Sequence, residues 1–135
     1  MPTALDLYRV TGRAGNVGTP GAPILHFDLL VNSSAGSISG QAHINQAVAP
    51  PDGEIHIHNV TGTVHELVFG GKVTLLVALQ GTYDRVLPPP LILTIVERFA
   101  AHFSVDQKWE GRGSFDYNNG SQVVNDVPVT SNRSR

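Results

Sequence analysis

No cysteine occurs among the 135 residues, which excludes a disulfide framework, thiolate metal ligands and thiol catalysis. The sequence also contains no run of about 18 apolar residues, so no membrane-spanning helix is expected. The first residues lack a basic segment followed by an apolar one, and no secretory signal is therefore predicted. We expect a cytoplasmic location by default, while export without a leader stays open.

Charged residues are also scarce. They make up 15% of the chain, and the formal net charge is -2. The one basic cluster is Arg133 and Arg135, so the electrostatic footprint of a nucleic-acid-binding protein is missing. The hydrophobic content of 41% is typical of a globular protein. We expect one domain over residues 1–130, which needs neither metal nor disulfide to fold, and a polar tail over residues 131–135.

The clearest structural pattern is a hairpin over residues 23–48. Apolar and polar side chains alternate along both of its arms, and a turn containing glycine separates them at residues 32–36. Six side chains are expected to point into the core: Leu25, Phe27, Leu29, Val31, Ile38 and Ile44. Five are expected to point outward: His26, Asp28, Gln41, His43 and Asn45.

Further strands are predicted along the rest of the chain, and all of them are joined by short turns. They cover residues 4–11, 54–69, 72–84, 91–105, 108–118 and 122–129. The segment 91–105 fits either a helix or a strand, and its β-branched residues favour a strand with a bulge at residues 98–101. The glycine-rich residues 12–22 are expected to form a loop, and the last strand is expected to lie at an edge because it contains Pro128.

These segments give seven or eight strands and predict a single antiparallel domain, either a β-barrel or a β-sandwich. Residues 61–63 are expected either to continue their strand or to bend it at a bulge near Gly62. The sheet is expected to curve strongly, because glycines occupy positions where large side chains would otherwise point inward. These glycines are Gly40, Gly81, Gly111 and Gly113.

The sharpest chemical pattern is His56-x-His58. Both imidazoles leave the same face of a strand, about 7 Å apart, and Glu54 shares that face. Such a pair can bind zinc if a neighbouring strand supplies a third ligand, for which His43 and His65 are the candidates. The alternative is an ordinary solvated strand face.

Catalytic patterns are weaker. Asp28 and His26 share a face, and Ser39 or His43 could face them across the hairpin, but any polar hairpin offers such a set. The carboxylates of Glu97, Glu110 and Asp116 cannot be positioned relative to one another from the sequence.

Ligand binding has a separate group of candidates near the end of the chain. Trp109 and Tyr117 could stack on a ligand, with Arg112 on the opposite face, and the polar His26 and His43 form a second candidate surface. The alternative is that the aromatic stripe belongs to the core.

Two long segments carry a resemblance to a known family. Residues Gly21 to Asn32 and Gly36 to Pro51 resemble a family of short bacterial proteins catalogued as a domain of unknown function. The segment Trp109 to Arg112, with Phe115 or Tyr117 beyond, is similar to a third motif of that family, although Gly113 adds a second glycine. The resemblance implies a soluble bacterial domain, and it implies no activity, catalytic residue or cofactor.

Three functions remain open at this point. The leading hypothesis is a non-enzymatic binding or interaction domain that presents a curved β-sheet to a protein or small-molecule partner. A small-ligand-binding barrel with an internal pocket is the alternative, and a metal-dependent enzyme built on His56 and His58 is the third. We expect no cofactor and no nucleic-acid partner, and we favour no enzymatic activity. A homo-oligomer is a further option.

Overall fold

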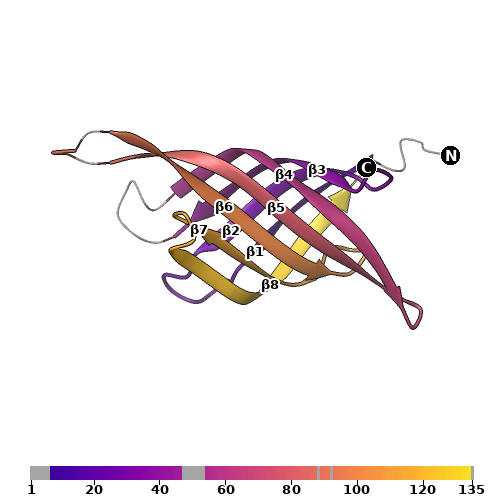
Figure 1. Ribbon diagram of the computed structural model, residues 1–135. Helices are drawn as coiled ribbons and strands as arrows, with labels where there is room; N and C mark the ends of the chain where they lie inside the picture. Colours follow the sequence, from indigo (N-terminus) through magenta and orange to yellow (C-terminus); the bar gives the residue numbers. More distant parts are fainter. Residues whose placement is uncertain (1–6, 47–53, 88, 92, 135) are drawn as a thin grey trace.

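The computed structural model describes residues 7–46, 54–87, 89–91 and 93–134. Eight antiparallel strands follow one another around a closed barrel, and the last strand pairs with the first (Figure 1). The predicted all-β antiparallel fold is confirmed, and its closure identifies a barrel rather than a sandwich. The strands are β1 (Leu7–Ala14), β2 (Ile24–Asn32), β3 (Ser37–Asn45), β4 (Glu54–Phe69), β5 (Lys72–Val86), β6 (Thr94–Val105), β7 (Gly111–Tyr117) and β8 (Gln122–Ser134).

Side chains fill the inside of the barrel. Eight strands enclose an interior about wide enough for packed side chains, and the inward positions carry aliphatic and aromatic residues. The largest fully buried ones are Trp109, Phe99 and Phe115. A ligand bound inside the barrel would therefore have to occupy the space that this hydrophobic core fills.

The predicted hairpin over residues 23–48 is formed by β2 and β3. Leu25 pairs with Ile44 and Val31 pairs with Ile38, so the expected apolar face points inward. The histidines His26 and His43 are directly opposite each other on the outer face. Residues 47–53, which include the predicted turn between this hairpin and the next strand, lie outside the described residues.

Two predictions about the ends of the chain are wrong. Residues 12–14 belong to β1 instead of a loop, because their backbone pairs with both β2 and β8. Residues 131–134, expected as a tail, continue β8 and pair with β1. This pairing closes the barrel, so β8 is not an edge strand. Polar residues suit this segment because only one face of the strand points into the core.

The irregularities lie elsewhere than expected. Residues 61–63 continue β4 in regular register, which is the first of the two alternatives, and the bulge of this strand is at His58 and Asn59, which together oppose Gln41 of β3. Residues 94–105 form a strand, as favoured, but pair with β5 without a register shift. In the turn between β7 and β8, Asn118 and Asn119 have φ values of 55° and 54°, as the two central residues of a type I′ turn require.

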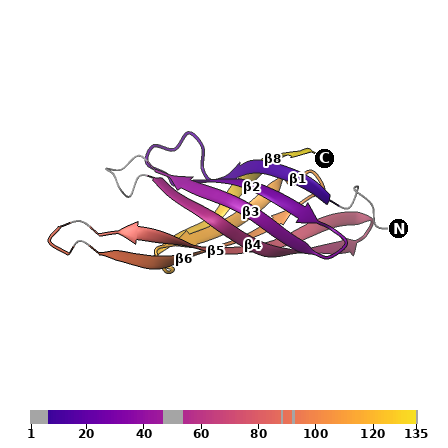
Figure 2. The same cartoon turned by 90° about the horizontal axis from the view of Figure 1, so that it is seen from above.

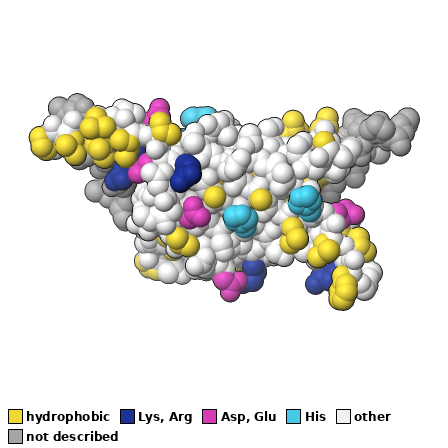
Figure 3. Space-filling model, viewed as in Figure 1, with side chains coloured by type: hydrophobic (Ala, Val, Ile, Leu, Met, Phe, Trp, Pro, Cys, Tyr) yellow, Lys and Arg dark blue, Asp and Glu magenta, His cyan; other side chains and the backbone are white. Residues whose placement is uncertain are grey.

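Two hairpins project beyond the barrel at its opposite ends (Figures 1 and 2). The β4–β5 hairpin turns at Gly70 and Gly71, as predicted, and the β5–β6 hairpin reverses direction between the end of β5 at Val86 and the start of β6 at Thr94. Both tips expose apolar side chains, which gather at the two ends in Figure 3. The exposed side chains are Leu67, Val68 and Phe69 at the first tip, and Val86, Leu91, Leu93 and Val96 at the second.

Candidate functional site

A row of histidines crosses the outer wall of the barrel. The strand registers pair His26 of β2 with His43 of β3, and His43 with His56 of β4. Neighbouring strands are about 4.8 Å apart, so side chains in successive pairs lie within contact distance. We call His26, His43, His56 and His58 the histidine row.

The rings of this row stack on one another. The ring centroids of His26 and His43 are 4.6 Å apart and their planes differ by 11°. His43 and His56 are 5.3 Å apart, and His56 and His58 are 6.1 Å apart with nearly parallel planes. Four of the six histidines of the chain therefore form one continuous surface, although they come from three strands.

The bulge in β4 shapes the site next to this row. Because His58 and Asn59 together oppose Gln41, the side chains of both bulge residues point outward, and His58 joins the row. The Asn59 side chain lies toward β5. Its amide nitrogen donates a hydrogen bond to the Thr82 hydroxyl at 2.8 Å, and its oxygen accepts one from the Thr82 backbone N–H at 2.9 Å. A hollow of about 390 Å³ lies beside the histidines and is also lined by Thr11, Asp28 and Gln41.

Among the residues that the structure describes, few permanently charged side chains surround the row. Arg13 of β1 is the cross-strand neighbour of His26. Asp28 accepts two hydrogen bonds from the guanidinium of Arg9, at 2.8 and 2.7 Å, and this arginine lowers the pKa of the Asp28 carboxyl. Glu54 lies 3.9 Å from Nε2 of His56.

The central imidazole of the row resists protonation. Partial burial lowers the pKa of His43, and the neighbouring imidazoles of His26 and His56 lower it further. Glu54 opposes this shift, but its effect is the smallest of the four. Positive charges on neighbouring imidazoles of the row would therefore repel one another.

The stacking of the rings does not favour a shared metal site. The free lone pair of an imidazole lies in the plane of its ring, so parallel rings do not direct their nitrogens at one point. Among the residues that the structure describes, no group of three or more histidines or carboxylates is arranged to hold a metal ion. His43 does lie beside His56, as a third ligand would need, whereas His65 pairs with Leu76 further along β4. A metal at His56 and His58 stays a prediction.

The aromatic candidates lie in the core. Trp109 is fully buried and donates a hydrogen bond from its indole nitrogen to the Tyr8 hydroxyl at 3.0 Å. Tyr117 is 3% exposed, and burial raises its pKa. Neither ring is available to stack on a surface ligand, so the two side chains belong to the hydrophobic core.

The third candidate of that group, Arg112, is exposed on the wall opposite the histidine row. Its guanidinium pairs with the Asp126 carboxylate and also donates to the Asp126 carbonyl oxygen at 2.6 Å. This ion pair borders a second hollow of about 490 Å³ over β4–β7, which is also lined by Leu76, Ala78 and His102. Figure 3 views this side of the barrel.

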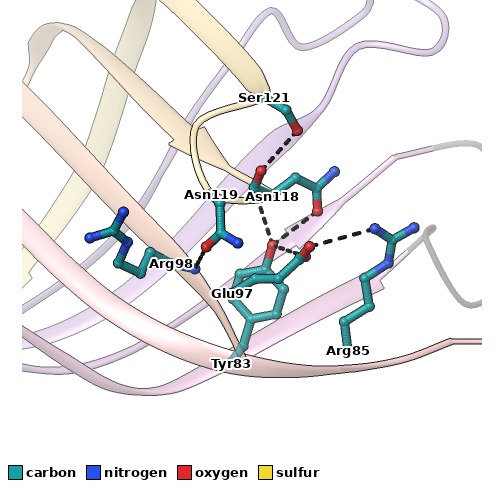
Figure 4. A network of polar contacts seen from close by, with 7 residues as sticks. All are labelled: Tyr83, Arg85, Glu97, Arg98, Asn118, Asn119 and Ser121. Atoms are coloured by element: carbon teal, nitrogen blue, oxygen red, sulfur yellow. Dashed lines mark hydrogen bonds and ion pairs between the residues drawn. The ribbon is translucent and has the colours of Figure 1, made fainter. Parts of the chain in front are cut away.

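A buried carboxyl lies at the base of the β5–β6 hairpin (Figure 4). Glu97 is 5% exposed, accepts a hydrogen bond from the Tyr83 hydroxyl at 3.0 Å and lies 3.6 Å from Arg85. The Tyr83 oxygen in turn accepts the backbone N–H of Asn118 at 2.8 Å, and burial raises the pKa of the Tyr83 hydroxyl. These contacts fasten the β7–β8 turn to the projecting hairpin, which is a structural role.

The other catalytic combinations do not assemble. Ser39 lies opposite Leu30, and Asp28 lies opposite Gln41 and is held by Arg9. Glu97 points into the barrel, whereas Asp116 of β7 is on the outward-facing side of its strand.

Comparison with known families agrees with the resemblance seen in the sequence. Residues 5–123 match the family described as "Domain of unknown function (DUF1842)". The chain belongs to this family. A search of curated proteins finds no match. In the described ranges, no helix is long and apolar enough to cross a membrane.

Proposed function

We propose that this member of the DUF1842 family is a non-enzymatic binding domain and that its binding face is the outer surface of β1–β4 at the histidine row. The observation that carries the proposal is the stacking of four imidazoles from three strands next to a hollow. Surface polar side chains that serve only solubility have no need to gather in this way.

Comparison with the other hypotheses supports this choice. An internal ligand would have to displace the packed core around Trp109 and Phe99. A metal enzyme would need converging ligands, and the stacked rings present parallel ones. The hollow over β4–β7 is the second candidate: its volume and its lining by Leu76 and Ala78 favour a small apolar ligand.

A fragment screen followed by amide chemical-shift mapping tests the location of the binding face. We expect fragments to shift the amide signals of Gln41, His43 and His58 most strongly. The variant His43→Ala should weaken this binding, while His102→Ala, which removes an exposed histidine from the opposite wall, should leave it unchanged. Fragments that gather around His102 and Ser104 instead would contradict the proposal and favour the second candidate.

A further inference from the structure

The histidine row continues onto β1 through Arg13. The successive registers align Arg13, His26, His43 and His56 as one line of cross-strand neighbours, with the two end residues three strand spacings apart. That distance is about 14 Å. One permanent cation and three imidazoles therefore face outward along a single line, with His58 stacked beside its far end.

The charge of this line depends on pH. Near neutral pH imidazoles are largely uncharged, so Arg13 provides most of the positive charge. A histidine side chain gains a positive charge in mild acid, and each ring of the row lies within 4.6–6.1 Å of the next ring. The lowered pKa of His43 has this repulsion as its second cause, after burial.

The surrounding carboxylates do not neutralise that charge. Among the described residues on the neighbouring strands, Asp28 is already held by Arg9 through two hydrogen bonds, which leaves its charge matched. Glu54 is close to His56 but lies at the far end of the line from Arg13. The protonated row thus carries more positive charge than these two described carboxylates balance.

The hollow beside the row offers room for a balancing group. Its volume of about 390 Å³ exceeds that of a small oxyanion, and the Thr11 hydroxyl and the Gln41 amide can donate hydrogen bonds there. Asp28 also lines the hollow, with its carboxylate held by Arg9, and Arg13 lies outside the lining at the β1 end of the line. Hydrogen bonds from cationic donors to an anion are about twice as strong as neutral ones. An anion at this place would remove the repulsion between the rings.

We propose that Arg13, His26, His43 and His56, with His58 beside them, bind a multiply charged oxyanion, as found in phosphate-bearing and polycarboxylate ligands, and that binding requires protonated imidazoles. This inference rests on the proposed function, because it names the ligand chemistry of the same face.

Sulfate is a suitable probe because its charge stays constant over the range in which histidine titrates. Calorimetric titration at fixed ionic strength should give an affinity at about pH 5.5 that is at least about tenfold higher than at about pH 7.5. Arg13→Gln should weaken binding at both pH values. Titrations with pyrophosphate and tricarballylate then distinguish phosphate-bearing from carboxylate ligands.

Two matched variants distinguish sulfate binding at the histidine row from attraction of sulfate to surface charge in general. His43→Gln should lower the sulfate affinity in acid about tenfold, whereas His102→Gln, an equal loss on the opposite wall, should not. If His43→Gln fails to fold, as judged by Trp109 fluorescence, the exposed His56→Gln serves instead. Equal loss in the two variants, or equal affinity at both pH values, overturns the proposal.

Two further outcomes are decisive. Zinc that binds the row near neutral pH, with no sulfate binding in acid, would show a metal site and overturn the anion proposal. Fragments that map to this face without any sulfate binding would overturn the anion proposal alone. Fragments that map to the opposite wall would instead contradict the proposed function.

Discussion

Replacing Trp109 by alanine is expected to lower the free energy of unfolding by about 3–5 kcal/mol. The indole is fully buried, packs near Phe27 and Tyr8 with ring centroids 6.3 and 6.5 Å away, and donates a hydrogen bond to the Tyr8 hydroxyl. Alanine would leave a cavity inside the barrel and remove this hydrogen bond. Because Trp109 is the one tryptophan of the chain, chemical unfolding should be followed by circular dichroism.

Trp109→Phe is the control for this prediction. Phenylalanine keeps an aromatic ring in the core but loses the indole donor, so it should cost less than alanine. A Trp109→Ala protein with an unchanged unfolding midpoint would contradict the packed interior and would reopen the hypothesis of an internal ligand site.

Replacing Gly40 by valine is expected to cost about 3 kcal/mol. A Cβ atom at this position would lie 2.2 Å from the Asp28 carbonyl oxygen and 2.9 Å from the Leu29 Cα. Both are backbone atoms of β2, so they cannot rotate away, and β2 and β3 would have to separate. The same two strands carry His26 and His43, and their ring stacking should weaken with the fold.

Ser39→Val provides the matched comparison, because Ser39 is the exposed neighbour of Gly40 on β3. A surface substitution of this kind usually changes stability by less than about 0.5 kcal/mol. Denaturant unfolding of the two variants should therefore differ clearly. Equal stability would mean that the close approach of β2 and β3 at Gly40 does not hold in solution.

The fold was largely predictable where side-chain alternation and short turns coincide. The β2–β3 hairpin has both, and its register follows from a turn of a few residues. A Cβ at Gly40, Gly81, Gly111 or Gly113 would approach other atoms to 2.7 Å or less, so none of these positions has room for the larger side chain that alternation alone would predict. Closure was not predictable, because it joins β1 to β8 across nearly the whole sequence.

The binding face was only partly visible in the sequence. His56 and His58 share a face by strand periodicity, and His26 and His43 share one by the hairpin pattern. Joining the two pairs requires the register between β3 and β4, which a bulge alters and which no short turn fixes. Arg13 was missed because the surrounding glycines indicated a loop, and only pairing with β2 aligns it with His26.

The titration of the His43 ring, followed by NMR with and without sulfate, tests the central claim most directly. A ligand that prefers the protonated state raises the pKa of the group it contacts. We therefore predict that sulfate raises the pKa of His43 from its lowered value in the free protein, and that the His102 ring signals on the opposite wall do not respond. A His43 titration that is identical with and without sulfate would contradict the account.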